Sequence, residues 1–296
     1  NRAQPWKNVS VLIDLARSIR QVKAIIRDFQ PNVGVGVGGY ASGAAMWAAA
    51  DMGIPILLQE QNGFAGVTNK ILKDKAAKIC VAYEGMERFF PADKIILTGN
   101  PVRQNLTEGR KSKNDSRKTL LIIGGSLGAR TINEAVKAAL PQLAKSDIHV
   151  VWQTGKVYYE SCQAAWEAAG QPANIECLDF LSDMPDRYAN ADLVISRAGA
   201  SSISELCLLG KPAILVPSPN VAEDHQTHNA MALVNKDAAV LVRDAEAAEK
   251  LIPTALELIQ NEAKLKTLHT NVLKLAQTDS AKRIAEEVIK LAKKQK

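Results

Sequence analysis

The sequence is poor in the features that mark several classes of protein. Aromatic residues make up only 5% of its 296 residues, which counts against nucleic-acid binding, because that binding relies on stacked aromatic side chains. The four cysteines are widely spaced and form no C-x-x-C pair, so the sequence indicates neither a zinc site nor a disulfide framework. No uninterrupted apolar run reaches the ~20 residues of a membrane-spanning helix. We therefore expect a globular protein that does not bind nucleic acid.

The overall composition is that of an ordinary globular chain. Hydrophobic residues make up 47% and charged residues 23%, with a formal net charge of +6. A basic balance favours acidic partners such as phosphate groups or an anionic membrane surface.

Short β-branched runs alternate with amphipathic stretches along the chain. The runs predict strands at 32–37, 54–59, 77–83, 94–99, 118–125, 148–154, 191–196 and 212–218. The stretches predict helices at 10–29, 42–52, 130–144, 157–169, 202–209, 226–235 and 245–260, and a basic amphipathic helix after Asp279. Such alternation indicates parallel sheets covered by helices on both faces. The polar stretch 104–117 is predicted to be a linker between two Rossmann-like domains.

The first of three glycine-rich turns follows the first predicted strand. Gly34, Gly36 and Gly39 spell G-x-G-x-x-G, and Glu60 follows about 20 residues later, as in dinucleotide-binding folds. However, Gly34 and Gly36 alternate with valine inside the strand, and the turn itself is 38–43. NAD binding is therefore the weaker interpretation.

The second turn, IIGGSLGAR, contains Gly124, Ser126 and Gly128 in the G-x-S-x-G pattern of hydrolase nucleophile elbows. Asp224 and His225 or His228 follow in the order that such a triad would need. No HGGG-type oxyanion segment precedes Ser126, and a hydroxyl among glycines at a helix start serves equally well to bind phosphate. Both interpretations stay open at this point.

The third turn, RAGASSISE, runs from a buried strand into an apolar helix. Backbone N–H groups at the start of a helix have no intrahelical acceptor, so the turn suits an anionic ligand. We place Glu205 in the first helical turn, where its carboxylate would accept hydrogen bonds from the paired hydroxyls of a sugar. Simple capping by Ser201 or Ser202 is the alternative.

No metal or cofactor is expected. His225 and His228 are three residues apart with Asp224 adjacent, which is a weak metal signal without a further ligand. The chain also lacks a D-x-D pair.

The ordered series GGYASG, EQNGFAG, TGNPVR, GGSLGAR, WQTGK, RAGASSISE and EDHQTHNA resembles the MurG family over nearly the whole chain. These are the UDP-GlcNAc:undecaprenyl-pyrophosphoryl-MurNAc-pentapeptide GlcNAc transferases of peptidoglycan synthesis. The resemblance implies a GT-B fold, with two Rossmann-like domains facing a cleft. It implies a first domain over 1–104, a UDP-GlcNAc-binding domain over 105–275, and a final helix over 276–296 that packs back on the first domain. It also implies inverting transfer of GlcNAc from UDP-GlcNAc to the C4 hydroxyl of the muramyl sugar in lipid I, which gives lipid II and UDP.

The resemblance implies a donor site mainly in the second domain. Ser126 would meet the diphosphate, the Leu181 backbone would hold the uracil edge, and Glu205 would accept the ribose hydroxyls. The phosphate turn would consist of Ala200, Ser201 and Ser202, the GlcNAc contacts would be Gln226 and Asn229, and Asn62 and Arg103 would reach in from the first domain.

One part of the family pattern has no match. Family members begin with a further glycine-rich turn, G-G-T-G-G-H, whose histidine is a candidate general base. We expect the segment that carries it to precede Asn1, so that the first domain is incomplete. We therefore assign no catalytic base, and we expect a chain beginning at Asn1 to bind donor poorly and to turn over little or not at all.

The lipid-borne acceptor implies a peripheral protein at the cytoplasmic face of the bacterial inner membrane. A candidate docking patch combines apolar and basic residues of the first predicted helix: Trp6, Lys7, Val9, Val11, Leu12, Ile13, Leu15, Arg17 and Arg20. The alternative is that these apolar side chains belong to a core. Lys70, Lys73, Lys75 and Lys78 would add charge or remain solvated.

Three alternatives to glycosyl transfer stay open. A sugar-nucleotide epimerase of the same fold would need no membrane patch. A serine hydrolase would use Ser126 as its nucleophile. A binding module without catalysis is the third.

Overall fold

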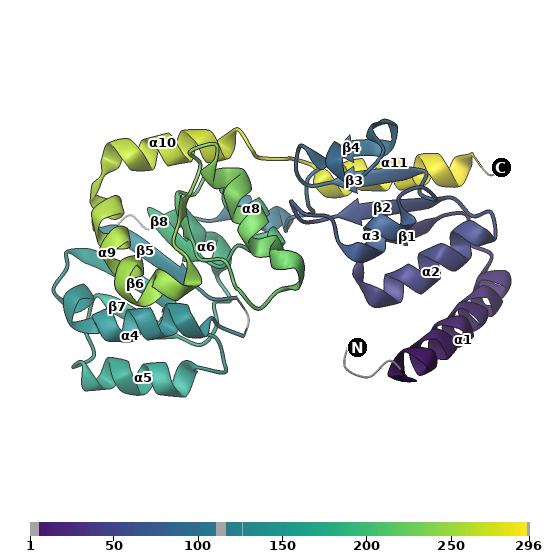
Figure 1. Cartoon of the computed structure of the whole chain (residues 1–296). Helices are drawn as coiled ribbons and strands as arrows, with labels where there is room; N and C mark the ends of the chain where they lie inside the picture. The colour runs from purple at the N-terminus through teal and green to yellow at the C-terminus, as the bar shows by residue number, and fades with distance from the viewer. Residues whose placement is uncertain (1–5, 111–116, 126, 295–296) are drawn as a thin grey trace. The chain divides into compact units, whose positions relative to one another are not determined.

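The computed structural model describes residues 6–110, 117–125 and 127–294, with side chains of the first helix described from Ile13 onward. The chain divides into two compact units. Unit 1 comprises Asn1–Asn100 and Asp279–Lys296, and unit 2 comprises Pro101–Thr278. Each unit is built on one parallel sheet with helices packed against it (Figure 1).

Unit 1 contains a four-stranded sheet in the order β1-β2-β3-β4, with every pairing parallel. Its elements are α1 (Trp6–Phe29), β1 (Gly34–Gly36), α2 (Gly39–Asp51), β2 (Ile56–Glu60), α3 (Val67–Leu72), β3 (Lys78–Val81), β4 (Ile95–Leu97) and α11 (Ser280–Lys293). Short 3-10 turns lie at Met86–Arg88 and Ala92–Lys94.

Both faces of the unit 1 sheet are covered. Ile56 and Leu58 of β2 point to one face and join a buried cluster with side chains of α2 and α3. Leu57, between them, points to the other face and packs with Leu291 of α11. Because neighbouring strand residues face opposite ways, this explains why β2 is apolar throughout its first three positions.

Gly36 allows α2 to lie close to β1. A Cβ atom at this position would lie 2.7 Å from Cγ of Met46 in α2 and 2.9 Å from Cδ2 of Leu58. The strand glycines therefore serve helix–strand packing, and the turn itself is formed by Gly38 and Gly39, both with positive φ. This supports the interpretation in which G-x-G-x-x-G is not a dinucleotide fingerprint.

Unit 2 contains a six-stranded parallel sheet in the order β10-β9-β8-β5-β6-β7. Its strands are β5 (Lys118–Ile123), β6 (Ile148–Gln153), β7 (Ile175–Leu178), β8 (Leu193–Ser196), β9 (Ala213–Leu215) and β10 (Val240–Leu241). Its helices are α4 (Arg130–Ala144), α5 (Tyr159–Ala168), α6 (Met184–Asn190), α7 (Ala200–Leu209), α8 (His225–Val234), α9 (Ala247–Gln260) and α10 (Glu262–Leu273), with 3-10 turns η3 (Gln104–Glu108), η4 (Ala222–Asp224) and η5 (Asp244–Glu246).

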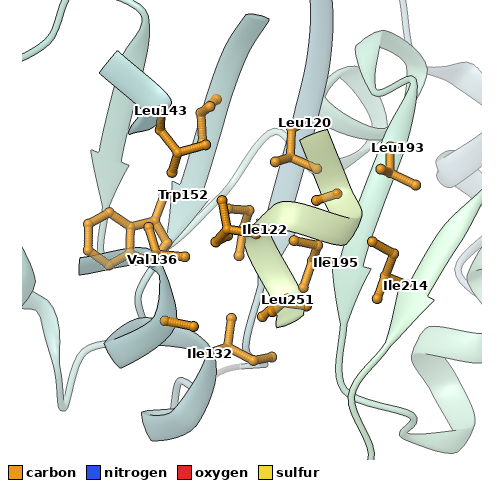
Figure 2. Close-up of a cluster of buried hydrophobic side chains, with 14 of the residues drawn as sticks. Leu120, Ile122, Ile132, Val136, Leu143, Trp152, Leu193, Ile195, Ile214 and Leu251 are labelled. Atoms are coloured by element: carbon orange, nitrogen blue, oxygen red, sulfur yellow. The ribbon is translucent and has the colours of Figure 1, made fainter. Parts of the chain in front are cut away.

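The main core of unit 2 lies between this sheet and the helices α4 and α9 (Figure 2). Leu120 and Ile122 of β5 point into it, while Leu121 is fully buried on the opposite face. Trp152 is fully buried, and its indole N–H donates to Oδ1 of Asn133 at 2.9 Å, so its polar atom is satisfied inside the core.

Each predicted strand is present, and each is one to four residues shorter than predicted. The strands β7 and β10 and the helices α3, α6 and α10 were not predicted from the sequence. β10 has two residues and β7 four, and α3 and α6 have six and seven. Segments this short do not complete a hydrophobic period.

The linker prediction for 104–117 is wrong for its first part. The side chain of Leu106 in η3 is 1% exposed. The N–H of Arg110 donates to Oδ1 of Asp186 at 2.7 Å, and Nδ2 of Asn190 donates to the Arg110 carbonyl at 3.0 Å. Residues 104–110 are therefore bound to α6, and residues 111–116 lie outside the described residues.

An ion network on β6, β7 and α6 gives unit 2 a predicted pH dependence. Glu176 accepts from Nε2 of His149 at 2.9 Å and from Nη1 of Arg187 at 2.7 Å. The His149 hydrogen bond, together with Arg187 and against the effect of burial, lowers the pKa of Glu176 from 4.5 to about 2. A lowered carboxyl pKa stabilises the fold above the unfolded pKa, and the contribution is lost as pH falls through the folded pKa.

We expect Glu176→Gln to reduce the free energy of unfolding by about 1 kcal/mol at pH 6, a value discounted because the side chain is 38% exposed. At pH 3 the difference should fall to less than half of that. Urea unfolding at the two pH values measures it, with the exposed Glu160→Gln as control. A difference that stays constant with pH would contradict the prediction.

Candidate donor-binding site

The unit 2 sheet reverses its strand order between β5 and β8. The chain runs outward from β5 through β6 to β7 on one side, and from β8 through β9 to β10 on the other. Ile123 at the end of β5 pairs with Ser196 at the end of β8, so the turns after these strands start level with each other. Open α/β sheets bind ligands at such a switch point.

The turn after β5 begins with Gly124 and Gly125, and Ser126 lies outside the described residues. Gln153, at the end of β6, holds this turn. Its Oε1 accepts from the Gly124 N–H at 3.1 Å, and its Nε2 donates to the carbonyls of Gly125 and Asp179, each at 3.1 Å. One buried side chain thus links the β5 turn to the loop that leads to Leu181.

The β5 and β6 turns touch through their glycines. A Cβ atom on Gly128 would lie 2.1 Å from the Thr154 carbonyl oxygen, and one on Gly155 would lie 2.2 Å from the Gly128 nitrogen. Both residues have positive φ. Asn133 of α4 donates to the same Thr154 carbonyl at 2.8 Å, so α4 is fastened to this turn.

Helix α7 begins at Ala200, two residues earlier than predicted, and Gly199 is its N-cap residue. No side-chain cap forms there, so the alternative interpretation, capping by Ser201 or Ser202, is not seen. The first N–H groups of the helix have no acceptor within it. Ser201 is exposed and Ser202 is half-buried, so solvent reaches this end of the helix. The helix dipole favours an anion at these N–H groups.

The placement of Glu205 in the first helical turn is wrong. Because α7 already begins at Ala200, Glu205 lies in its second turn. Helical side chains lean toward the N-terminus, which brings the carboxylate back alongside the start of the helix rather than onto its axis.

Arg197 and Asp244 form an ion pair that holds the turn after β8 in place. Nη1 of Arg197 contacts Oδ1 of Asp244 and donates to the carbonyls of Val216 and Pro217 at 3.1 and 3.3 Å. Oδ2 of Asp244 accepts from Oγ1 of Thr131 in α4 at 3.0 Å. The pair therefore joins the ends of β8 and β9 to α4.

Glu205 is held by two partners. Its side chain is 16% exposed; Oε2 accepts from the Tyr188 hydroxyl at 3.0 Å, and Oε1 lies 3.7 Å from Nη2 of Arg103. Burial raises the pKa of Glu205, while Tyr188 and Arg103 oppose that rise. Arg103, which the resemblance assigned to the first domain, belongs to unit 2.

The remaining unit 2 residues are placed as follows. The side chain of Leu181 is 4% exposed, which leaves its backbone as the part that could contact a ligand. Gln226 is half-buried, and its Oε1 accepts from the Ser218 N–H at 2.9 Å. Asn229 is fully buried, and its Nδ2 donates to the Ala198 carbonyl at 3.2 Å, which places it behind the β8 turn rather than on an open surface.

Asn62 lies in unit 1, in a loop organised by a buried carboxylate. Oε1 of Glu60 accepts from the Asn62 N–H at 3.2 Å, and its Oε2 accepts from the Gly66 N–H at 3.0 Å and from Nδ2 of Asn69 at 2.9 Å. Glu60, 2% exposed, therefore shapes this loop.

Sequence reasoning missed Tyr188 and Gln153, because their partners lie 17 and about 28 positions away along the chain. The feature that could have identified these two residues in the sequence is a polar group in an otherwise apolar segment, close to one of the motifs described above. Within the described residues, no group of three or more His, Cys, Asp or Glu side chains is arranged to hold a metal ion.

Comparisons with known proteins identify the class. Residues 119–288 match the glycosyltransferase family 28 C-terminal domain, and residues 1–81 match the glycosyltransferase family 28 N-terminal domain. A crystal structure of Acinetobacter baumannii MurG matches with a TM-score of 0.79 and 31% identity over 94% of this chain and 80% of that chain. The predicted GT-B fold is confirmed, and the chain is a glycosyltransferase.

Relatives narrow the class to one family. A Bacteroides thetaiotaomicron protein is 58% identical over 99% of this chain and 81% of its own length. A Parabacteroides distasonis protein is 54% identical over 99% of this chain and 82% of its own length. Both are named UDP-N-acetylglucosamine–N-acetylmuramyl-(pentapeptide) pyrophosphoryl-undecaprenol N-acetylglucosamine transferase. The chain belongs to this family, the MurG family.

The epimerase alternative has support from fold alone. A Neisseria meningitidis UDP-GlcNAc 2-epimerase bound to UDP-GlcNAc matches with a TM-score of 0.64 but 15% identity. The relatives above 50% identity favour the transferase over both the epimerase and the serine hydrolase.

Proposed function

We propose that the protein transfers GlcNAc from UDP-GlcNAc to the C4 hydroxyl of the muramyl sugar of lipid I, with inversion, giving lipid II and UDP in peptidoglycan synthesis. The single observation that carries the proposal is the pair of turns at the β5/β8 switch point, beside an α7 N-terminus without a side-chain cap. It agrees with the names of the relatives.

The proposed chemistry is one displacement at the anomeric carbon. The acceptor oxygen bonds to that carbon, the carbon–oxygen bond to the β-phosphate breaks, and the bonding electrons leave with UDP. The acceptor proton passes to a base that we do not assign. N–H groups at the start of α7 would stabilise the charge that grows on departing UDP.

The donor contacts follow from the same proposal. Ser126 and the turn formed by Ala200, Ser201 and Ser202 would bind the diphosphate. The Leu181 backbone would hold the uracil edge, and Glu205 the ribose. The remaining contacts that unit 2 would make to the donor are those of Gln226 and Arg103, while Asn229, buried behind the β8 turn, would support that turn.

A transfer assay tests the proposal. The protein, with and without an amino-terminal extension, is incubated with lipid I and UDP-GlcNAc labelled in its sugar. Acceptor-dependent appearance of label in the lipid fraction supports the proposal. Epimerised sugar nucleotide formed without acceptor, or labelling of the protein by a fluorophosphonate, would favour the alternatives.

We also propose peripheral docking on an anionic membrane surface, at the cytoplasmic face of the inner membrane. In α1, Ile13 and Leu15 are 54% and 45% exposed, and the exposed Arg17 and Arg20 follow Ile13 on the same side of the helix. The side chains of Trp6, Lys7, Val9, Val11 and Leu12 lie outside the described residues. Apolar side chains flanked by basic ones suit the boundary of an anionic bilayer.

Among the described residues, the structure contains no helix with the length and apolar character needed to cross a bilayer.

We expect the double variant Ile13→Glu, Leu15→Glu to bind vesicles of anionic lipid about tenfold more weakly, because two apolar side chains no longer enter the bilayer. Co-sedimentation at low and high salt measures this. Ile289→Glu, at a 50% exposed position of α11, is the matched control. Undiminished sedimentation of the double variant would contradict docking through α1.

A further inference from the structure

Tyr188 is a fully buried tyrosine whose hydroxyl is hydrogen-bonded to Glu205, the residue proposed to bind the ribose. It lies in α6, is 0% exposed, and donates to Oε2 of Glu205 in α7 at 3.0 Å. A buried hydroxyl needs a hydrogen-bond partner, and a backbone carbonyl would be sufficient for that purpose. The partner of Tyr188 is instead the carboxylate of Glu205, which lies near the N-terminus of α7.

The two oxygens of Glu205 have different surroundings. Oε2 is taken by the buried Tyr188 hydroxyl. Oε1 lies 3.7 Å from Nη2 of Arg103, whose side chain is 62% exposed. The carboxylate therefore has one oxygen bonded to a buried hydroxyl and one oxygen near a largely exposed guanidinium. An ionised carboxylate has about four acceptor positions, so Oε1 retains capacity for a ligand hydroxyl.

We propose that Tyr188 is a positioning residue, which orients the Glu205 carboxylate toward a ribose hydroxyl and so sets the preference for a ribonucleotide over a deoxyribonucleotide. The inference rests on the proposed function, because it takes Glu205 as the group that accepts from the ribose. Tyr188 acts only through Glu205.

The helix that carries Tyr188 is itself clamped. A Cβ atom on Gly109 would lie 1.9 Å from the Pro185 carbonyl oxygen, so the chain after η3 lies directly on α6. The N–H of Arg110 donates to Asp186 at 2.7 Å. Arg103 precedes this same segment, so both partners of Glu205 come from one packed assembly.

Removing the Tyr188 hydroxyl also changes the titration of Glu205. The titratable and charged groups that face it are Tyr188 from α6 and Arg103 ahead of η3. Burial raises the pKa of Glu205, and both partners lower it. Without the hydroxyl the pKa rises further, so the loss of ribose recognition on acidification begins at a higher pH.

Calorimetry with UDP and 2′-deoxy-UDP tests the proposal across a range of pH. We expect the unmodified protein to prefer UDP by about tenfold or more, because a charged group accepts from the hydroxyl. Tyr188→Phe should reduce that preference at least about threefold and move the acid limb of UDP binding to higher pH. Tyr159→Phe, in α5, should change neither.

Glu205→Gln separates this inference from the proposed function. If Glu205→Gln leaves the preference unchanged, the ribose assignment itself is wrong. If Glu205→Gln lowers the preference and Tyr188→Phe does not, only the role of Tyr188 is overturned. If Tyr188→Phe fails to fold, Tyr188 is replaced by 3,5-difluorotyrosine, whose hydroxyl is a stronger hydrogen-bond donor. The pH at which UDP binding is lost on acidification should then fall. If that pH does not change, the inference is overturned.

Discussion

Glu205→Ala is expected to weaken UDP binding by about 1–3 kcal/mol, because a charge-assisted acceptor for the ribose is lost. The side chain is 16% exposed and held between Tyr188 and Arg103, so little reordering is needed before it accepts from a ligand. Preorganised groups give up less free energy on binding than mobile ones. Isothermal calorimetry with UDP measures the effect, on this chain and on a form extended at its amino terminus.

Two controls separate ligand contact from damage to the fold. Glu257→Ala removes an exposed helical glutamate of α9 and should leave UDP affinity unchanged. Glu205→Gln keeps an acceptor for the Tyr188 hydroxyl while removing the charge, so it should lie between the unmodified protein and the alanine variant. Equal UDP binding by Glu205→Ala and the unmodified protein would remove the ribose assignment.

The fold was predictable because its signals are local. β-Branched runs such as 118–123 carry their strand preference within a few residues, and strict alternation with helices leaves few topologies other than parallel sheets. The sequence also predicts turns at Gly128 and Gly155, because these glycines come after apolar runs. The sequence does not reveal that the two touch, which depends on β5 and β6 being neighbours.

The site was less predictable because its supports are distant in sequence. Tyr188 and Glu205 meet only after α6 and α7 have packed, and Arg103 reaches Glu205 across about 100 residues. The helix start was misplaced because serine is a favoured N-cap residue, so Ser201 and Ser202 indicated a later start, whereas the helix begins at Ala200 with Gly199 as its N-cap residue. Asn229 was predicted to be a sugar contact from its motif, and only packing shows that its amide faces the Ala198 carbonyl.

Arg197→Met is expected to reduce the free energy of unfolding by about 2–4 kcal/mol, because it leaves a half-buried carboxylate and two carbonyls without their donor. The Arg197 and Asp244 side chains are 16% and 19% exposed. Removal of one member of such a pair costs more than the pair contributes, since the remaining charge stays out of water. UDP affinity should fall as well, because Arg197 holds the β8 turn against the end of β9.

The double variant Arg197→Met, Asp244→Leu decides whether the cost comes from the stranded charge. It removes both charges, so it should recover at least half of the lost stability while UDP affinity stays low, because the turn still lacks its anchor to Val216 and Pro217. Urea unfolding measures the first quantity and calorimetry the second. Lys250→Met, which breaks the exposed pair with Glu246, is the matched control and should cost less than about 1 kcal/mol. A double variant no more stable than Arg197→Met would show that the backbone contacts, and not the ion pair, hold this corner of the sheet.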